Sequence, residues 1–92
     1  MSDLDAVLQQ RLPEPGPWLS TQLRLAAVLC PLVESDGQDH LLFAVRPPGS
    51  HPHAGQIGFP GGMQRPDEEP VPCALRECHE EIGVPASAVT VL

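Results

Sequence analysis

A high density of proline and glycine is the strongest constraint on how this chain can fold. These two residue types account for 12 and 8 of its 92 residues. Proline fixes φ and removes a backbone donor, and glycine weakens helix and strand interiors. The chain is therefore expected to form short elements joined by turns, which leaves little room for a helical bundle. Because domains usually run to roughly 100–150 residues, the chain holds one domain at most.

Charge and composition exclude several classes of protein. Twelve acidic and five basic residues give a formal net charge of −7, and all five basic residues are arginines. A chain without a basic stripe is poorly suited to coat nucleic acid, and its aromatic content of 3% offers few stacking platforms for single strands. The longest apolar stretch, Leu25–Val33, is far shorter than the ~20 residues of a membrane span. Neither nucleic acid nor a membrane is therefore expected as a partner.

The cysteines and the N-terminus suggest a reducing compartment. Cys30, Cys73 and Cys78 are odd in number and irregularly spaced, unlike a disulfide framework. The first residues are acidic and lack the apolar core of a signal peptide. A cytoplasmic location is the expectation.

Hydrophobic periodicity and turn signals predict the strands. Asp36-Gly37 is a strong hairpin signal because both residues accept a positive φ. Segments rich in apolar residues flank it and recur later in the chain. The expected strands are Leu23–Val33, which is predicted to be buried, then His40–Val45, Gln56–Phe59 and the start of a further strand at Val89–Leu92. This last segment looks like an element cut at its beginning, which favours a truncated domain.

Two helices are predicted. The first lies within the first twelve residues, with Ser2 as its N-cap, and leads into a proline-rich connector, so that residues 1–20 form an N-terminal part. The second covers Val71–Ile82 and ends at Gly83, a typical C-cap. Its expected core stripe is Leu75, Cys78 and Ile82, with Ala74 beside it.

Three carboxylates share another face of this second helix. Glu77, Glu80 and Glu81 stand at positions i, i+3 and i+4, where like charges repel. A divalent cation would remove that repulsion, and oxygen ligands suit Mg²⁺ or Mn²⁺. A solvated acidic face is the alternative interpretation of the same spacing.

The residues around these carboxylates form a longer pattern. It begins at Gly62 and ends at Val84. Written out, it is Gly62-x5-Glu68-x7-Arg76-Glu77-Cys78-x-Glu80-Glu81-x-Gly83-Val84. This resembles the box of the Nudix hydrolases, Gly-x5-Glu-x7-Arg-Glu-U-x-Glu-Glu-x-Gly-U, in which U is a bulky aliphatic residue. Cys78 at the first U position departs from the pattern but still packs as a small hydrophobe.

The resemblance implies a fold, a reaction and residue roles. Nudix domains are α/β/α sandwiches with a mixed sheet, so the fold class is α/β (α+β), and residues 1–92 would be the N-terminal part of one such domain. They are enzymes that hydrolyse nucleoside diphosphates linked to another moiety. Carried onto this sequence, Mg²⁺ or Mn²⁺ would be bound by Glu77, Glu80, Glu81 and the Gly62 carbonyl. Arg76 would orient a neighbouring glutamate, with Glu68 as an outer carboxylate.

A second pattern stands upstream of the box. It runs from Leu42 through Arg46 to the segment Gly55–Gly62. It resembles the motif of the coenzyme A pyrophosphatase branch of the Nudix family, roughly Leu-Leu-Thr-x-Arg-x4-Arg-x3-Gly-x3-Phe-Pro-Gly-Gly. Phe43 and Ala44 replace the second Leu and the Thr, and His51 replaces the second Arg with a weaker, pH-dependent cation. The implied substrate-binding residues are Arg46, His51, Gly55, Gln56, Phe59 and Gly61.

The expected function is hydrolysis of coenzyme A or its derivatives to 3′,5′-ADP and a 4′-phosphopantetheine. The small-molecule substrate is the expected partner, and a homodimer stays open. ADP-ribose or a dinucleotide is the alternative substrate within the family. An inactive fragment that serves as a binding module is a second alternative. A zinc module built on Cys73, Cys78, His79, His51 and His53 is disfavoured by its loose spacing.

Overall fold

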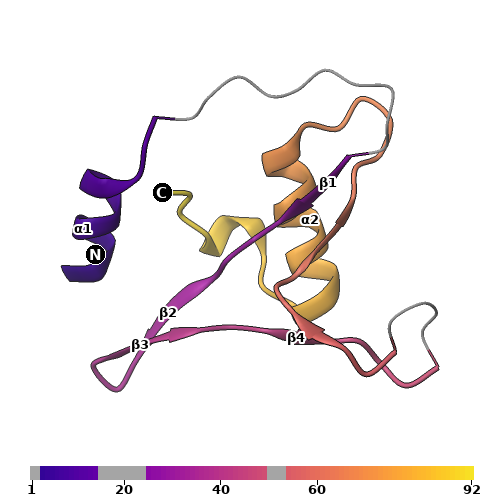
Figure 1. Ribbon diagram of the computed structural model, residues 1–92, viewed down its shortest axis with the longest axis horizontal. Coiled ribbons are helices and arrows are strands. Elements are labelled where there is room, and N and C mark those ends of the chain that lie inside the picture. Colours follow the sequence, from indigo (N-terminus) through magenta and orange to yellow (C-terminus); the bar gives the residue numbers. More distant parts are fainter. Residues whose placement is uncertain (1–2, 15–24, 50–53) are drawn as a thin grey trace.

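The computed structural model describes residues 3–14, 25–49 and 54–92 (Figure 1). The elements in chain order are α1 (Asp3–Arg11), β1 (Ala26–Val28), β2 (Leu32–Ser35), β3 (Gln38–Leu41), β4 (Ala44–Val45), β5 (Ile57–Gly58), β6 (Gly61–Met63), α2 (Pro70–Ile82) and the 3₁₀ helix η1 (Ala86–Ala88). All are short, as the density of proline and glycine predicts. The connector after α1 and the segment holding His51 and His53 lie largely outside the described residues, and so does Ser2.

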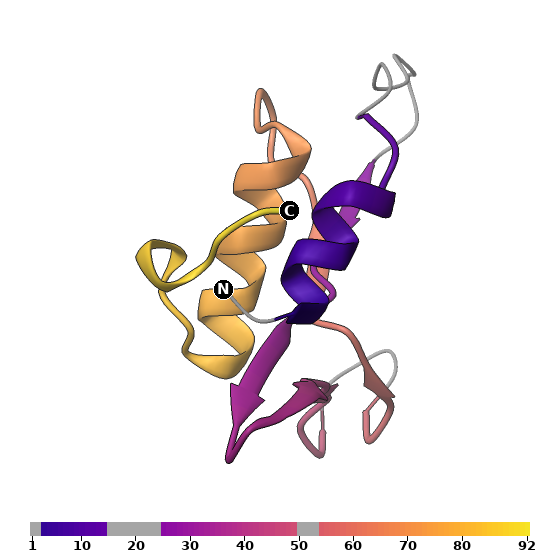
Figure 2. The ribbon, with the colours of Figure 1, turned by 90° about the vertical axis from the view of Figure 1, so that its left-hand side faces the viewer.

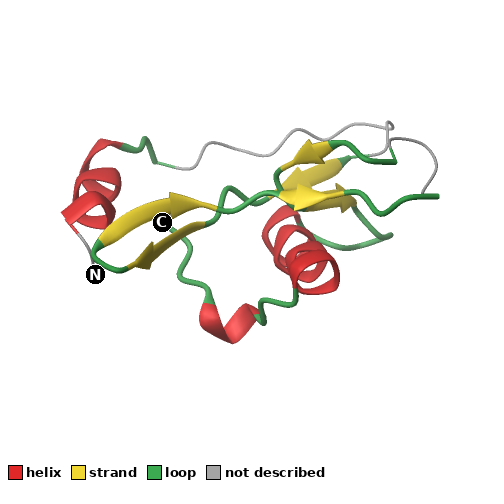
Figure 3. Ribbon diagram, turned by 90° about the horizontal axis from the view of Figure 1, so that it is seen from below, coloured by secondary structure: helices red, strands yellow, loops and turns green. Residues whose placement is uncertain are grey.

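The strands pair as three antiparallel ribbons. These are β1 with β6, β2 with β3, and β4 with β5. Helix α2 packs against β1 and β6, and Figure 3 shows it on one side of these strands. This arrangement confirms the α+β class. The strands in the described ranges contain no parallel pair, which a mixed sheet would add.

The apolar stretch predicted as one buried strand is two strands. The backbone pairs with β6 up to Leu29, whose N–H donates to the Pro60 carbonyl at 2.8 Å. It then turns to pair with β3 from Leu32 onward, and Pro31 between the two strands has no N–H to extend a ladder. Val28 is 62% exposed. Over residues 25–33, the prediction of one buried strand was therefore wrong in both extent and burial, while Leu23 and Arg24 lie outside the described residues.

The predicted hairpin turn is confirmed. Asp36 and Gly37 have φ of 53° and 73°, as a turn of type I′ requires, and they join β2 to β3. The return strand divides in the same way as the first, into β3 and β4. Figure 2 shows the β2–β3 hairpin extending away from α2.

Helix α2 begins and ends as the sequence predicts. Pro70 occupies the first turn, where a missing N–H costs nothing. Gly83 adopts φ of 75° and donates its N–H to the His79 carbonyl at 3.0 Å. The core side of the helix differs from the prediction. Its buried residues are Cys73, Ala74 and Cys78, whereas Leu75 and Ile82 are only half-buried.

The two ends of the described chain contribute little burial. Helix α1 has no buried residue and lies apart from α2 in Figures 1 and 3. Residues 89–92 follow η1 without forming the expected strand, because no ladder in the described ranges reaches them. The described residues include no helix long and apolar enough to cross a membrane.

Candidate active site

Arg76 on α2 is the centre of a charged network. Its Nε and Nη2 donate to the two carboxylate oxygens of Glu68, both at 2.8 Å. Nη1 donates to Glu77 Oε1 at 2.8 Å, and Nη2 also reaches the Met63 carbonyl at 3.2 Å. Paired, bidentate geometry makes such bonds strong and directional. Arg76 therefore fixes the loop that carries Glu68 against the first half of α2.

Glu68 is held in its ionised form. Hydrogen bonds from the Arg76 guanidinium, and then from the Arg65 backbone N–H at 3.0 Å, lower the pKa of Glu68 from 4.5 to about 2. The side chains of Glu68 and Arg76 are 15% and 18% exposed. The same contacts raise the pKa of Arg76. Glu68, the predicted outer carboxylate, thus holds the loop before α2 in place.

A pH dependence of stability follows from Glu68. Its pKa is lower in the folded chain than in the unfolded chain, so the unfolded state binds more protons between about pH 4.5 and 2. The free energy of unfolding should therefore fall as the pH falls through this window. Urea unfolding is measured at a series of pH values from 7 downward. The free energies of unfolding of wild type and Glu68→Gln should differ most at pH 7 and become equal in acid. Glu34→Gln on the exposed hairpin is the control, and parallel curves for wild type and Glu68→Gln would contradict this role.

Glu77 lies directly over a glycine of β6. A Cβ placed on Gly62 would come within 2.6–2.8 Å of the Glu77 carboxyl atoms, so only glycine leaves room for this carboxylate. The Gly62 carbonyl accepts a hydrogen bond from Cys73 Sγ at 3.5 Å. Metal binding by the Gly62 carbonyl stays a prediction. Sequence reasoning did not assign Cys73 a place here.

Glu81 faces the neighbouring glycine. The Gly61 N–H points to Glu81 Oε2 at 3.4 Å. Withdrawal of its carboxylate from water raises the pKa of Glu81, and the negative charge of Glu77 adds to this effect. The Gly61 N–H and the positive charge of Arg46 oppose it. Glu81 therefore lies on the side of α2 that faces β6.

Glu80 has different neighbours. Its carboxylate accepts from Arg76 Nη1 at 3.3 Å and from Arg65 Nη2 at 3.5 Å, and its side chain is 49% exposed. Sequence reasoning missed Arg65, which occupies a variable position of the box. The only sequence signal was its positive charge close to Glu68.

The carboxylates of α2 have the donor chemistry that a hard divalent cation prefers. Glu77 and Glu81 both approach β6 at adjacent glycines. Loss of contact with water is the main cause that raises the pKa of Glu81, and repulsion from Glu77 is a smaller one. A cation there would relieve this repulsion, and carboxylate oxygens are the ligands that Mg²⁺ and Mn²⁺ favour. In the described ranges no three acidic, His or Cys side chains are gathered closely enough to hold a metal. Glu80 turns instead toward the arginines.

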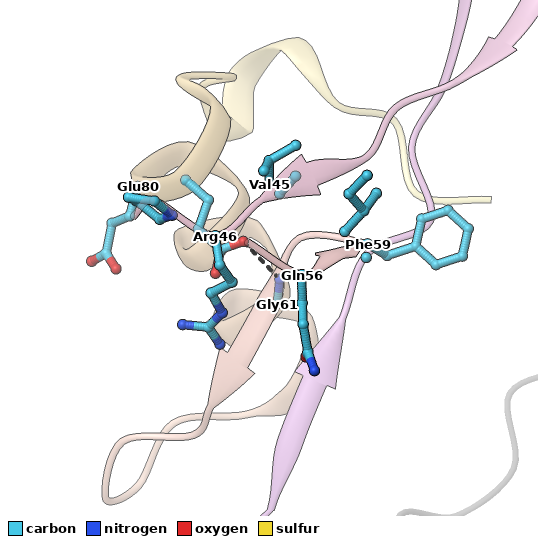
Figure 4. Close-up of a pocket in the computed structure, with 11 residues that line it drawn as sticks. Val45, Arg46, Gln56, Phe59, Gly61 and Glu80 are labelled. Atoms are coloured by element: carbon cyan, nitrogen blue, oxygen red, sulfur yellow. Dashed lines mark hydrogen bonds between the residues drawn. The ribbon is translucent and has the colours of Figure 1, made fainter. Parts of the chain in front are cut away.

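The site opens into a pocket of about 390 Å³ that joins the two sequence patterns (Figure 4). Its lining residues come from β4, β5, β6, α2 and the turns between them: Ala44, Val45, Arg46, Pro47, Gln56, Ile57, Gly58, Phe59, Gly61, Glu80 and Glu81. In the close-up, Arg46 and Glu80 lie on one side and Phe59 on the other. Four predicted substrate-binding residues thus share a pocket with two predicted metal ligands.

Two predicted substrate-binding residues are not placed in this pocket. Gly55 is absent from the lining and instead closes the turn before β5, with φ of 79° and its N–H donating to the Arg46 carbonyl at 3.0 Å. His51 lies outside the described residues. For the disfavoured zinc module, Cys73 and Cys78 are buried against the strands while His79 is exposed.

The helix, its loop and the carboxylates on its strand-facing side define a Nudix domain. The sequence matches the NUDIX domain family over residues 23–92, and the chain belongs to this family. Nudix hydrolases generally use divalent metal ions.

Relatives carry the same family name. The chain is 41% identical over its whole length to a protein of Yersinia enterocolitica and 40% identical to one of Photorhabdus laumondii, each named uncharacterized Nudix hydrolase NudL. A protein of that name from Yersinia pestis is 40% identical over 91% of this chain. The chain spans about half the length of these relatives, 47%, 49% and 45% respectively.

Proposed function

We propose that this domain hydrolyses the diphosphate bond of coenzyme A or its derivatives in a metal-dependent reaction. The observation that carries the proposal is the common pocket of Arg46 and the α2 carboxylates Glu80 and Glu81. Arg46 belongs to the motif that resembles the coenzyme A branch, and the two glutamates belong to the Nudix box. A substrate bound between them would have its phosphates near both a guanidinium and the metal ligands.

The reaction exchanges one bond for another. Water attacks a phosphorus of the diphosphate, the bond to the bridging oxygen breaks, and two phosphate monoesters leave as 3′,5′-ADP and 4′-phosphopantetheine. Arg46 would bind a phosphate oxygen, a contact for which a guanidinium is well shaped. The side chains of Gln56 and Phe59 would orient the substrate along β5. Glu80 and Glu81 alone would repel the diphosphate, so this pocket needs a cation to bind its ligand.

Glu77, Glu80 and Glu81 would hold that cation, Mg²⁺ or Mn²⁺. When bound, such a cation neutralises charge on the diphosphate and lowers the pKa of the attacking water. Arg76 positions Glu77 through the 2.8 Å bond from Nη1, while Glu68 keeps Arg76 in place. The contacts of Glu80 with Arg65 and Arg76 are longer and exposed. Such ion pairs contribute little to stability, so breaking them to bind a metal costs little free energy.

The proposal is tested with a substrate panel on the longest available form of the chain. Coenzyme A, ADP-ribose and a dinucleotide are offered separately with Mg²⁺ or Mn²⁺, and the products are separated by chromatography. Cleavage of coenzyme A to 3′,5′-ADP and 4′-phosphopantetheine is expected. Cleavage of ADP-ribose or the dinucleotide but not of coenzyme A would retain the Nudix reaction and reject coenzyme A as the substrate. The panel is needed because His51 replaces the second arginine of the coenzyme A motif.

Arg46→Ala tests the role given to the upstream motif. Arg46 should bind the ground state and the transition state alike, so the substitution should raise KM for coenzyme A more than it lowers kcat. Steady-state kinetics on both proteins measure the two constants. Arg11→Ala on the remote helix α1 is the control. An unchanged KM in Arg46→Ala would mean that Arg46 only supports the β4–β5 ribbon.

A further inference from the structure

The three α2 carboxylates are not equivalent in this structure. Glu77 and Glu81 lie against the adjacent glycines of β6, Gly62 and Gly61. Glu80 instead accepts hydrogen bonds from two arginines. Its side chain is 49% exposed, against 17% for Glu77. Arg76 thus contacts both Glu77 and Glu80, whereas the Arg65 guanidinium contacts Glu80.

The two arginines that contact Glu80 differ in their freedom. Arg76 is fixed by bonds of 2.8 Å to Glu68 and Glu77, so its position does not depend on Glu80. Arg65 is 63% exposed, and Glu80 is the partner of its guanidinium in the described residues. Only its backbone bonds to Glu68: the Arg65 N–H donates to the Glu68 carboxylate, and the Arg65 carbonyl accepts from the Glu68 N–H, both at 3.0 Å. The Arg65 side chain can therefore be changed without disturbing the loop.

We propose that Arg65 is a positioning residue that holds Glu80 away from the metal and thereby lowers the affinity of the site for divalent cations. This inference rests on the proposed metal site. A carboxylate oxygen that accepts a guanidinium N–H must give up that bond to enter a cation's coordination shell. The metal-free chain is stabilised by the Arg65–Glu80 contact at 3.5 Å, and the metal-bound chain is not. Exposed pairs of this kind change an equilibrium by about 2- to 5-fold.

Arg65→Gln tests this directly with Mn²⁺ as the only ligand. The full chain is titrated with Mn²⁺, free Mn²⁺ is measured by electron paramagnetic resonance, and far-ultraviolet circular dichroism checks the fold. Arg65→Gln should bind Mn²⁺ about 2- to 5-fold more tightly than wild type. Arg11→Gln removes the same charge from α1 and should bind like wild type. Unchanged or weaker binding by Arg65→Gln would overturn the proposal.

A second pair of variants separates release of Glu80 from a simple change of charge. In a Glu80→Gln background the carboxylate that Arg65 holds is gone, so adding Arg65→Gln should bring no further gain in affinity. A gain of the same size in that background would show that Arg65 acts through space on the metal, and the proposal would fail. If wild type itself binds no Mn²⁺, both the metal site and this inference are wrong. If wild type binds Mn²⁺ and Arg65→Gln binds it with the same affinity, the metal site stands and only the role given to Arg65 is wrong.

Discussion

Replacing Glu81 by Gln is expected to lower kcat by on the order of 10³-fold or more while leaving the fold unchanged. The substitution keeps the shape of the side chain but removes the charge that a divalent cation needs. The Gly61 N–H contact at 3.4 Å survives it, because an amide oxygen still accepts a hydrogen bond. Initial rates with coenzyme A and Mg²⁺ measure the loss.

A second variant on the same helix and a control just before it accompany Glu81→Gln. Glu80→Gln should lower kcat to a similar degree. Glu69→Gln should not, because Glu69 precedes α2 and makes no side-chain cap to it. A fully active Glu80→Gln/Glu81→Gln double variant would remove the metal-site hypothesis.

Gly61→Ala is expected to cause the largest loss of stability. A Cβ at this position would overlap the Ala27 carbonyl and approach Val28 Cα at 2.8 Å, and backbone atoms cannot move aside as a side chain can. The β1–β6 pair on which α2 packs would be forced apart. The free energy of unfolding should fall by about 1–3 kcal/mol, which for a domain of this size is on the order of 10 °C in Tm.

Gly58→Ala is the matched control for that substitution. Gly58 is a strand glycine in the same segment, and a Cβ there meets no atom within 4 Å. It should change Tm little, and thermal unfolding of both variants makes the comparison. Equal Tm values for Gly61→Ala and Gly58→Ala would contradict the close approach of β1 and β6.

Elements that are determined by residues close together in the sequence could be predicted from it. The apolar spacing and Gly83 fix the limits of α2 within one residue, and Asp36-Gly37 fixes the β2–β3 turn. The division of the first strand was not predictable in this way. It depends on which partner strand each half pairs with, β6 or β3, and these partners are distant in the sequence.

The candidate site shows the same division. Resemblance to the Nudix box and the upstream motif pointed to Arg46, Glu80 and Glu81, which share one pocket. The contact of Arg65 with Glu80 could not be predicted, because it depends on the turn before α2, where Asp67 adopts φ of 63°. The burial of Cys73 was not predicted because the periodicity placed the core stripe on Leu75. In the structure, the approach of β6 buries Cys73 completely.

Incubation of coenzyme A in ¹⁸O-labelled water shows whether this domain cleaves the diphosphate bond by attack of water in a metal-dependent reaction. The chain is incubated with coenzyme A and Mn²⁺, and the products are analysed by mass spectrometry beside a sample without metal. The expected products are 3′,5′-ADP and 4′-phosphopantetheine, with one ¹⁸O atom on a phosphate of one product, and no cleavage is expected without the metal. Intact coenzyme A in the presence of bound Mn²⁺, or release of inorganic phosphate from the 3′ position instead, would contradict it.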